Sequence, residues 1–189
     1  MRIDRIETVR LECHWGPPED NNKRVWPIHF VHTNTGHVGI GRGGDPRLVA
    51  EEFGPLLVGE DPRRTAQLWQ KMYDSAWRFR GPGRSAMTTL GALDVALWDL
   101  KAKLAGEPLW RTFGAKQPRV KTYASGLDYP LSDDDLFAFY RGMAERGVDG
   151  GKLKIGMDAE GDLRRIGVMR EALSPAAARP RLMLDVNEY

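Results

Sequence analysis

The strongest constraint on the fold is a repeating alternation of strand-like and helical segments in residues 116–189. Strand-like runs occupy residues 120–125, 152–155 and 182–186, and helical patterns fill the intervals between them. The centres of the strand-like runs are about 31 residues apart, a usual length for one βα unit of a parallel sheet. Residues 116–189 are therefore predicted to form successive parallel strands with a helix between each pair.

Residues 1–115 follow a different pattern, which predicts a separate α+β module. Strand-like alternation covers residues 3–11, and two more strand-like runs flank a turn at residues 34–36, which predicts a hairpin. Asp61 followed by Pro62 predicts the N-cap and first residue of a helix. A second helix is predicted from apolar spacing and a closing Gly106. Its apolar face carries Leu90, Leu93, Leu97, Leu100 and Leu104.

Composition and charge exclude several classes of protein. The formal net charge of +2 and the scattered arginines give no basic surface for nucleic acid. No run of about 18 apolar residues is present, so no membrane span is predicted. The single cysteine, Cys13, excludes an internal disulfide framework. With no signal-peptide core at the N-terminus, we expect a cytoplasmic protein that acts on a small molecule.

Two short motifs at the ends of neighbouring predicted strands could carry chemistry. Lys152 and Lys154 are two apart on one strand and therefore share a face, as do Asp185 and Asn187 at the end of the next. Alone, a Lys-x-Lys pair is usually a solvated edge, and an Asp-x-Asn pair is usually a turn or a helix cap. On adjacent parallel strands covered by helices, however, buried lysines are costly unless they have a partner or a function.

The residue types suggest a reaction. Two close ammonium groups disfavour each other's charge, so we expect the pKa of one lysine to fall until it can act as a general base. Asp185 offers a hard oxygen ligand suited to Mg²⁺. A base beside a metal that binds a carboxylate suits removal of the proton α to that carboxylate, through an enediolate that the metal stabilises.

The whole chain resembles the mandelate racemase and muconate lactonizing enzyme branch of the enolase superfamily. The segments that carry the resemblance, in family order, are Thr33-x-x-Gly36-x-x-Gly39-x-Gly41, Gly91-Ala92-Leu93-Asp94-Val95-Ala96-Leu97-Trp98-Asp99-Leu100-Lys101-Ala102-Lys103, Gly106-x-Pro108-Leu109, Lys152-x-Lys154-Ile155-Gly156 and Asp185-x-Asn187. The resemblance implies an α+β capping domain over residues 1–115, followed by the first three βα units of a TIM-type (β/α) barrel over residues 116–189. The barrel is then expected to be incomplete in this chain.

The resemblance also assigns roles to the motif residues. It implies that Lys154 is the base on one face of the substrate and that Lys152 assists it and contacts the substrate carboxylate. Asp185 becomes the first carboxylate ligand of Mg²⁺, and Asn187 a substrate-binding residue.

In the capping domain, the resemblance implies two specificity loops. The loop from Trp15 to Trp26 is expected to be the first, so both tryptophans are expected to bind substrate, and residues 43–47 form part of the second. The polar residues of the first loop favour an acid sugar as the substrate. His14, His29, His32 and His37 all lie in this module, and we interpret them as loop or sheet residues.

The resemblance leaves several alternatives open. The family needs two further carboxylate ligands and a second acid/base, which are expected beyond Tyr189. We therefore expect a parent protein of roughly 350–400 residues, by counting βα units, and a homo-oligomer at full length. An acid-sugar dehydratase is the leading hypothesis, with a racemase, epimerase or cycloisomerase as the alternative. A non-catalytic module is the third hypothesis, should the natural chain end at Tyr189.

Overall fold

A computed structural model describes residues 1–14, 23–79, 83–126, 128–156 and 158–187. Internal contacts divide the chain into two compact units, Met1–Pro118 and Arg119–Tyr189, which are described separately below. Within the described ranges, no helix combines the length and apolar character needed to cross a membrane.

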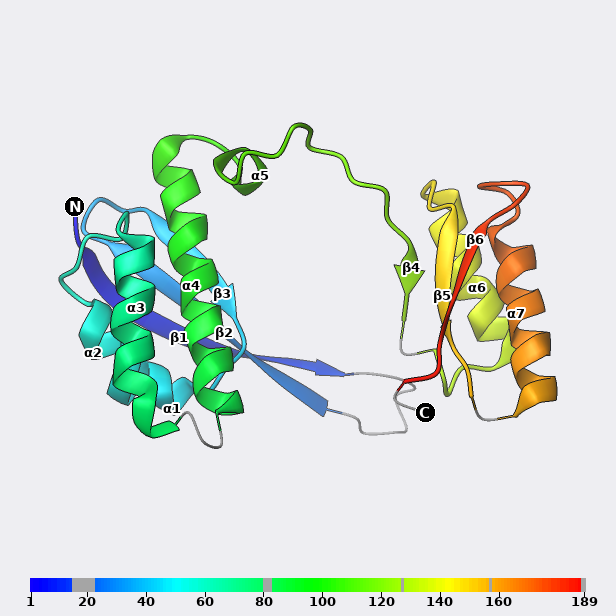
Figure 1. Ribbon diagram of the computed structural model, residues 1–189, viewed down its shortest axis with the longest axis horizontal. Coiled ribbons are helices and arrows are strands. Elements are labelled where there is room, and N and C mark those ends of the chain that lie inside the picture. The colour runs from blue at the N-terminus through cyan, green and yellow to red at the C-terminus, as the bar shows by residue number, and fades with distance from the viewer. Residues whose placement is uncertain (15–22, 80–82, 127, 157, 188–189) are drawn as a thin grey trace. The chain divides into compact units, whose positions relative to one another are not determined.

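The first unit is an antiparallel sheet covered by helices (Figure 1). Its strands are β1 (Ile3–His14), β2 (Lys23–Thr33) and β3 (Val38–Arg42), in that order across the sheet. The predicted hairpin is confirmed, because β2 and β3 pair antiparallel and the Thr33 amide donates to the His37 carbonyl at 3.0 Å. The main helices are α3 (Thr65–Ser75) and α4 (Arg84–Ala105). Short helical segments are α1 (Pro46–Leu48), the π-helical η2 (Val49–Phe53), α2 (Gly54–Leu57), the 3-10 helix η3 (Ala76–Phe79) and α5 (Leu109–Thr112).

Helix α4 packs directly on strand β3, and two glycines make this possible. A Cβ atom added at Gly41 would lie 1.9 Å from the Ala92 carbonyl oxygen, and one at Gly39 would lie 2.1 Å from that of Ala96. Only glycine allows the two backbones to approach this closely. The helix ends at Gly106, whose φ of 68° lies in the left-handed region, so the predicted C-terminus is confirmed. The core of the unit includes Ile3, Val31, Phe53, Leu57, Leu68, Met72, Leu93, Leu97 and Leu100.

The predicted start of the first long helix is wrong. Helix α3 begins at Thr65, its N-cap is Arg64, and no side chain caps it. The Asp61 carboxylate instead accepts hydrogen bonds from the amide and the guanidinium of Arg63, which close a tight turn before the helix. Aspartate is favoured both in such turns and at helix N-caps, so the local sequence did not distinguish the two.

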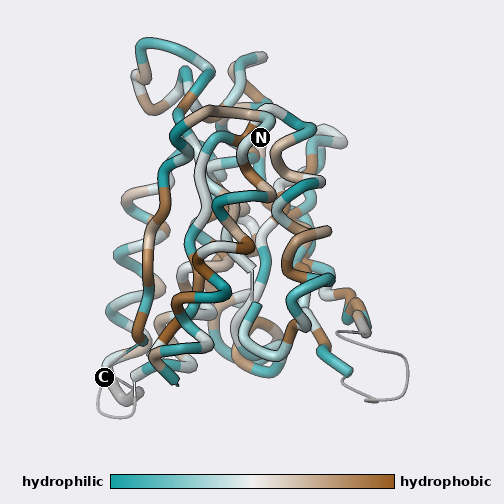
Figure 2. The backbone as a smooth tube through the Cα atoms, turned by 90° about the vertical axis from the view of Figure 1, so that its right-hand side faces the viewer, coloured by the Kyte–Doolittle hydropathy of each residue, from teal (hydrophilic) through white to brown (hydrophobic). Residues whose placement is uncertain are grey.

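The second unit is a parallel sheet covered on one face by two helices (Figure 1). Its strands are β4 (Ala124–Ser125), β5 (Gly150–Lys154) and β6 (Arg181–Asp185), with β5 in the centre. Its helices are α6 (Asp133–Glu145) and α7 (Ala159–Leu173), capped by Ser132 and Asp158. Leu136, Tyr140, Leu153, Met169 and Leu173 are fully buried between these helices and the sheet. Figure 2 shows hydrophilic and hydrophobic residues mixed along the helical turns, as expected for helices with one buried face.

Strand β4 is shorter than predicted. Its expected range was residues 120–125, but only Ala124 and Ser125 pair with β5. The reason is the position of the partner, because β5 begins at Gly150, and Ala124 already pairs with Gly151. Val120 is consequently 86% exposed.

Candidate active site

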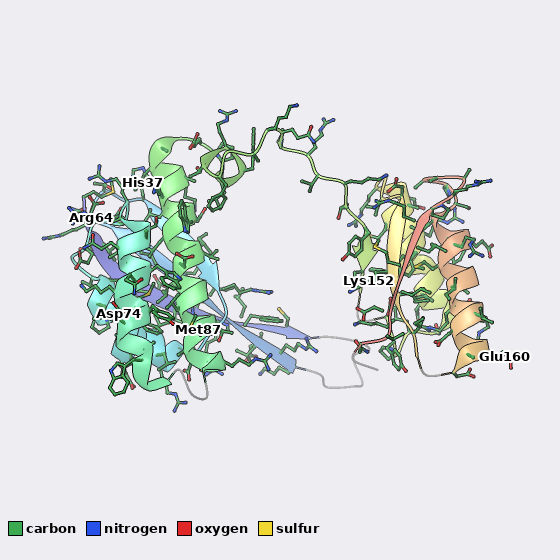
Figure 3. All side chains as sticks on the ribbon, viewed as in Figure 1. His37, Arg64, Asp74, Met87, Lys152 and Glu160 are labelled. Atoms are coloured by element: carbon green, nitrogen blue, oxygen red, sulfur yellow. The ribbon has the colours of Figure 1, made fainter. Side chains whose placement is uncertain are left out.

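The site lies at the carboxyl ends of β5 and β6, on the face of the sheet that the helices do not cover. Leu153 is fully buried against α6 and α7, so its neighbours Lys152 and Lys154 project from the opposite face. Figure 3 shows Lys152 on this side of the sheet. The register places Lys154 opposite Asp185 of β6. Strand parity and parallel pairing therefore bring the two predicted motifs together.

Both lysines converge on one carboxylate oxygen. The Nζ atoms of Lys152 and Lys154 lie 2.8 Å and 2.7 Å from Oδ2 of Asp185. The Lys154 ammonium also donates to Oδ1 of Asn187. The side chains of Lys152, Lys154 and Asp185 are 27%, 19% and 24% exposed, so the charges are partly removed from water yet remain accessible to a ligand.

The backbone after β6 turns sharply and holds Asn187 beside the lysines. Asn187 adopts a φ of 57°, a left-handed conformation that asparagine tolerates better than most residues. Its amide donates to Oδ1 of Asp185 at 2.9 Å. The two oxygens of Asp185 thus have different partners: Oδ1 accepts from the Asn187 amide in the turn, and Oδ2 accepts from the two ammonium groups.

The electrostatics of the cluster are dominated by Asp185. Hydrogen bonds from Lys152 and Lys154 hold the pKa of the Asp185 carboxyl well below its usual range. The hydrogen bond to Asp185 raises the pKa of Lys152. Lys152 is therefore not a lysine whose pKa falls, because a carboxylate lies between the two ammonium groups and compensates their repulsion.

The donor set fits one side of a magnesium site. Asp185 presents carboxylate oxygen atoms, the ligand type that Mg²⁺ takes in proteins. Among the residues that the structure describes, no group of three or more histidine, cysteine, aspartate or glutamate side chains could hold a metal ion. The described part of the chain could therefore contribute a first carboxylate ligand rather than a complete coordination shell.

Sequence reasoning missed two buried residues directly beneath the lysines. Asp128 and Tyr140 are both fully buried. Oδ1 of Asp128 accepts a hydrogen bond from the Lys154 amide at 3.2 Å, and the Tyr140 hydroxyl donates to the Lys152 carbonyl at 2.7 Å. Asp128 follows the predicted strand as one polar residue of a loop, and nothing local marks it as buried. Tyr140 carried a weak signal, since it lies on the apolar face of α6 and needs a partner for its hydroxyl.

The predicted capping-domain residues lie in the first unit or outside the described residues. Trp15 lies outside them. Trp26 stacks under the Arg42 guanidinium, whose carbon lies 4.3 Å from the ring centroid. Both residues line an open cavity of about 1040 Å³, together with residues 43–46 and the start of α4.

Among the histidines of this unit, His29 is fully buried in the sheet. Its Nε2 lies 2.7 Å from the Gly43 carbonyl and its Nδ1 lies 2.9 Å from the Thr8 hydroxyl. A carbonyl only accepts, so Nε2 carries the proton and Nδ1 accepts from Thr8. Burial lowers the pKa of His29. The interpretation of His29 as a sheet residue agrees with this placement.

Comparison with known proteins identifies a family that matches the first unit and relatives that match nearly the whole chain. Residues 28–114 match the family described as the mandelate racemase / muconate lactonizing enzyme N-terminal domain. The chain is 32% identical to the D-galactarolactone cycloisomerase of Agrobacterium fabrum, over 99% of this chain and 52% of that protein. It is 34% identical to the L-talarate/galactarate dehydratase of Salmonella typhimurium, over 98% of this chain and 51% of that protein.

A solved structure gives the same result for the fold. The crystal structure of a racemase from Streptomyces coelicolor A3(2) with bound magnesium matches with a TM-score of 0.81 and 27% identity, over 98% of this chain and 55% of that chain. The match of residues 28–114 and the alignments over 98–99% of this chain point to one class of protein. The chain belongs to the mandelate racemase / muconate lactonizing enzyme branch of the enolase superfamily. It spans about half the length of the relatives just described.

Proposed function

We propose that this chain supplies the base and one metal ligand for Mg²⁺-dependent abstraction of the proton α to a substrate carboxylate. The observation that carries the proposal is the convergence of Lys152 and Lys154 on Asp185 at the carboxyl ends of adjacent parallel strands. In βα barrels this end of the sheet is where catalytic residues gather.

Each residue has a separate role in the proposed reaction. Bound Mg²⁺ would supply Lewis-acid stabilisation of the negative charge on the substrate carboxylate, with Asp185 as a ligand. Lys154 would take the α-proton at Nζ, and Lys152 would remain an ammonium that stabilises the developing charge. The Lys154 amine lies 2.7 Å from Oδ2 of Asp185, so it must leave that carboxylate before it can reach a substrate proton.

The substrate class is proposed from the relatives. One acts on D-galactarolactone and another on L-talarate and galactarate, so we propose an acid sugar or its lactone as the substrate. We propose a dehydratase, and the cycloisomerase among the relatives supports the alternative that an isomerisation follows proton removal. The second acid/base separates the two reactions, because it decides whether a hydroxyl leaves or a proton returns.

The test is exchange of the α-proton of galactarate with solvent in D₂O, followed by NMR on the protein as its gene encodes it. Lys154→Ala should slow exchange about 10²–10⁴-fold, the usual effect of losing a general base. Lys152→Ala should lower turnover yet retain measurable exchange. Lys121→Ala is the matched control, since Lys121 is a surface lysine of the same unit that pairs with Asp149. Exchange at the wild-type rate in Lys154→Ala would assign the base to another residue.

A further inference from the structure

Strand β4 stops pairing with β5 before β5 ends. Its last paired residue, Ser125, lies opposite Lys152. On the other side of β5, the Ile155 amide donates to the Asp185 carbonyl at 3.1 Å. Successive peptide groups of a strand point to opposite edges, so the Lys154 amide points toward the β4 side, where the residues that the structure describes form no further pair with β5.

Two side chains instead bind the peptide groups on this edge of β5. Oδ1 of Asp128 accepts from the Lys154 amide at 3.2 Å, and the Tyr140 hydroxyl donates to the Lys152 carbonyl at 2.7 Å. The Tyr140 hydroxyl also lies 2.9 Å from Oδ2 of Asp128, so its proton is shared between two acceptors. Burial and the adjacent carboxylate raise the pKa of Tyr140 far above its usual range, which keeps the hydroxyl protonated as a donor.

The pair is itself anchored by both helices of the unit. Tyr140 projects from α6, and Arg165 of α7 donates to the carbonyls of Asp128 and Leu131 at 2.6 Å and 2.8 Å. The loop after β4 and both helices are thus connected to β5 at the peptide groups of the two lysines. A buried carboxylate is costly unless its hydrogen bonds are satisfied. The carboxylate of Asp128 is fully buried, and both of its oxygens accept hydrogen bonds.

We propose that Asp128 and Tyr140 are positioning residues, which hold the peptide groups of Lys152 and Lys154 so that both amines reach Asp185. Neither residue touches the reacting atoms, and both act through β5. The inference rests on the proposed function only for its effect on turnover, because the geometry can be tested without a substrate.

The experiment compares three variants of the gene-encoded protein with a fourth that serves as a control. Asp128→Ala removes the acceptor of the Lys154 amide. Asp128→Asn keeps it, because the amide oxygen accepts from Lys154 while the amide nitrogen donates to the Tyr140 oxygen. Tyr140→Phe is the milder second variant, which removes one hydroxyl and leaves the packing in place. Ile166→Val, a partly buried core residue of α7, controls for simple loss of stability.

Two readouts need no substrate. Amide hydrogen exchange of the Lys152–Lys154 segment should be about tenfold faster in Asp128→Ala, as expected for loss of one hydrogen bond. In Asp128→Ala, competitive acetylation followed by mass spectrometry should show Lys152 and Lys154 reacting several-fold faster than in the wild type, with Lys121 as the internal reference. Asp128→Asn should restore both values, Tyr140→Phe should give intermediate values, and Ile166→Val should match wild type. With galactarate as the probe, Asp128→Ala should lower kcat and leave KM nearly unchanged.

Wild-type amide exchange and lysine reactivity in Asp128→Ala and Tyr140→Phe would overturn the proposal. So would a failure of Asp128→Asn to restore them, since the acceptor atom would then not be the cause. If both readouts change as expected but the wild-type protein exchanges no α-proton of galactarate, the positioning role stands and the proposed function fails for this substrate.

Discussion

The packing of α4 on β3 leads to a sharp prediction at Gly41. Gly41→Ala would place a Cβ atom 1.9 Å from the Ala92 carbonyl oxygen and 2.9 Å from its carbonyl carbon. Ordinary contact begins near 3.4 Å, so helix and strand must separate by 3.4 − 1.9 = 1.5 Å. The obstacle is backbone rather than the end of a flexible side chain, so no rotamer change can relieve it.

The cost follows from what α4 buries. Leu93, Leu97 and Leu100 are fully buried, and a gap of about 0.5–1 Å already forfeits a quarter to a half of each contact energy. We expect the free energy of unfolding of the first unit to fall by about 3 kcal/mol, at the upper end of overpacking effects. This corresponds to a loss of roughly 10 °C in Tm for a unit of this size.

The matched control is the same chemical change on the facing helix. A Cβ at Gly91 of α4 has no atom within 4 Å, so Gly91→Ala should stabilise the helix by about 0.5–1 kcal/mol. Urea unfolding by circular dichroism measures both variants, and hydrogen exchange assigns the change to residues 28–42 and 84–105. A Gly41→Ala protein within about 0.5 kcal/mol of wild type, the range of neutral surface changes, would refute the packing argument.

Two further predictions concern the metal and pH. Asp185→Asn should weaken Mg²⁺ binding and activity together, because the ligand loses its charge; unchanged affinity in a calorimetric titration would exclude Asp185 as a ligand. Burial lowers the pKa of His29 below 6.5, so the unfolded chain takes up the proton first as pH falls. The stability that neutral His29 contributes is therefore complete above about pH 6.5 and decreases below it, and His29→Gln should flatten the dependence of Tm on pH between about 7 and 5. The same slope in variant and wild type would show that another group is responsible.

Much of the fold could be predicted from the sequence because it depends on local periodicity. Alternation and turn residues predicted the hairpin, and helical spacing with Gly106 predicted the end of α4. The Ser132 cap of α6 is equally local, because its partner is the Asp135 amide three residues on. The predicted start of α3 was wrong because Asp61 could serve either as a helix N-cap or as a turn residue, and the local sequence did not distinguish the two.

The meeting of the candidate site residues also followed from the sequence, although they are far apart along the chain. Lys154 and Asp185 are separated by one βα unit, and parallel strands bring equivalent positions together at one edge. Side-chain parity then places Lys152 and Lys154 on one face. Neither step requires knowledge of any other contact.

Only the tertiary structure revealed what supports the site. The role of Asp128 depends on where β4 stops pairing, and that point is set by where β5 begins. The role of Tyr140 depends on how α6 packs against the same strand. The pKa of Lys152 rises because Asp185 lies within hydrogen-bond distance of its amine. Such effects arise from distances between separate elements, which residue spacing along one chain does not contain.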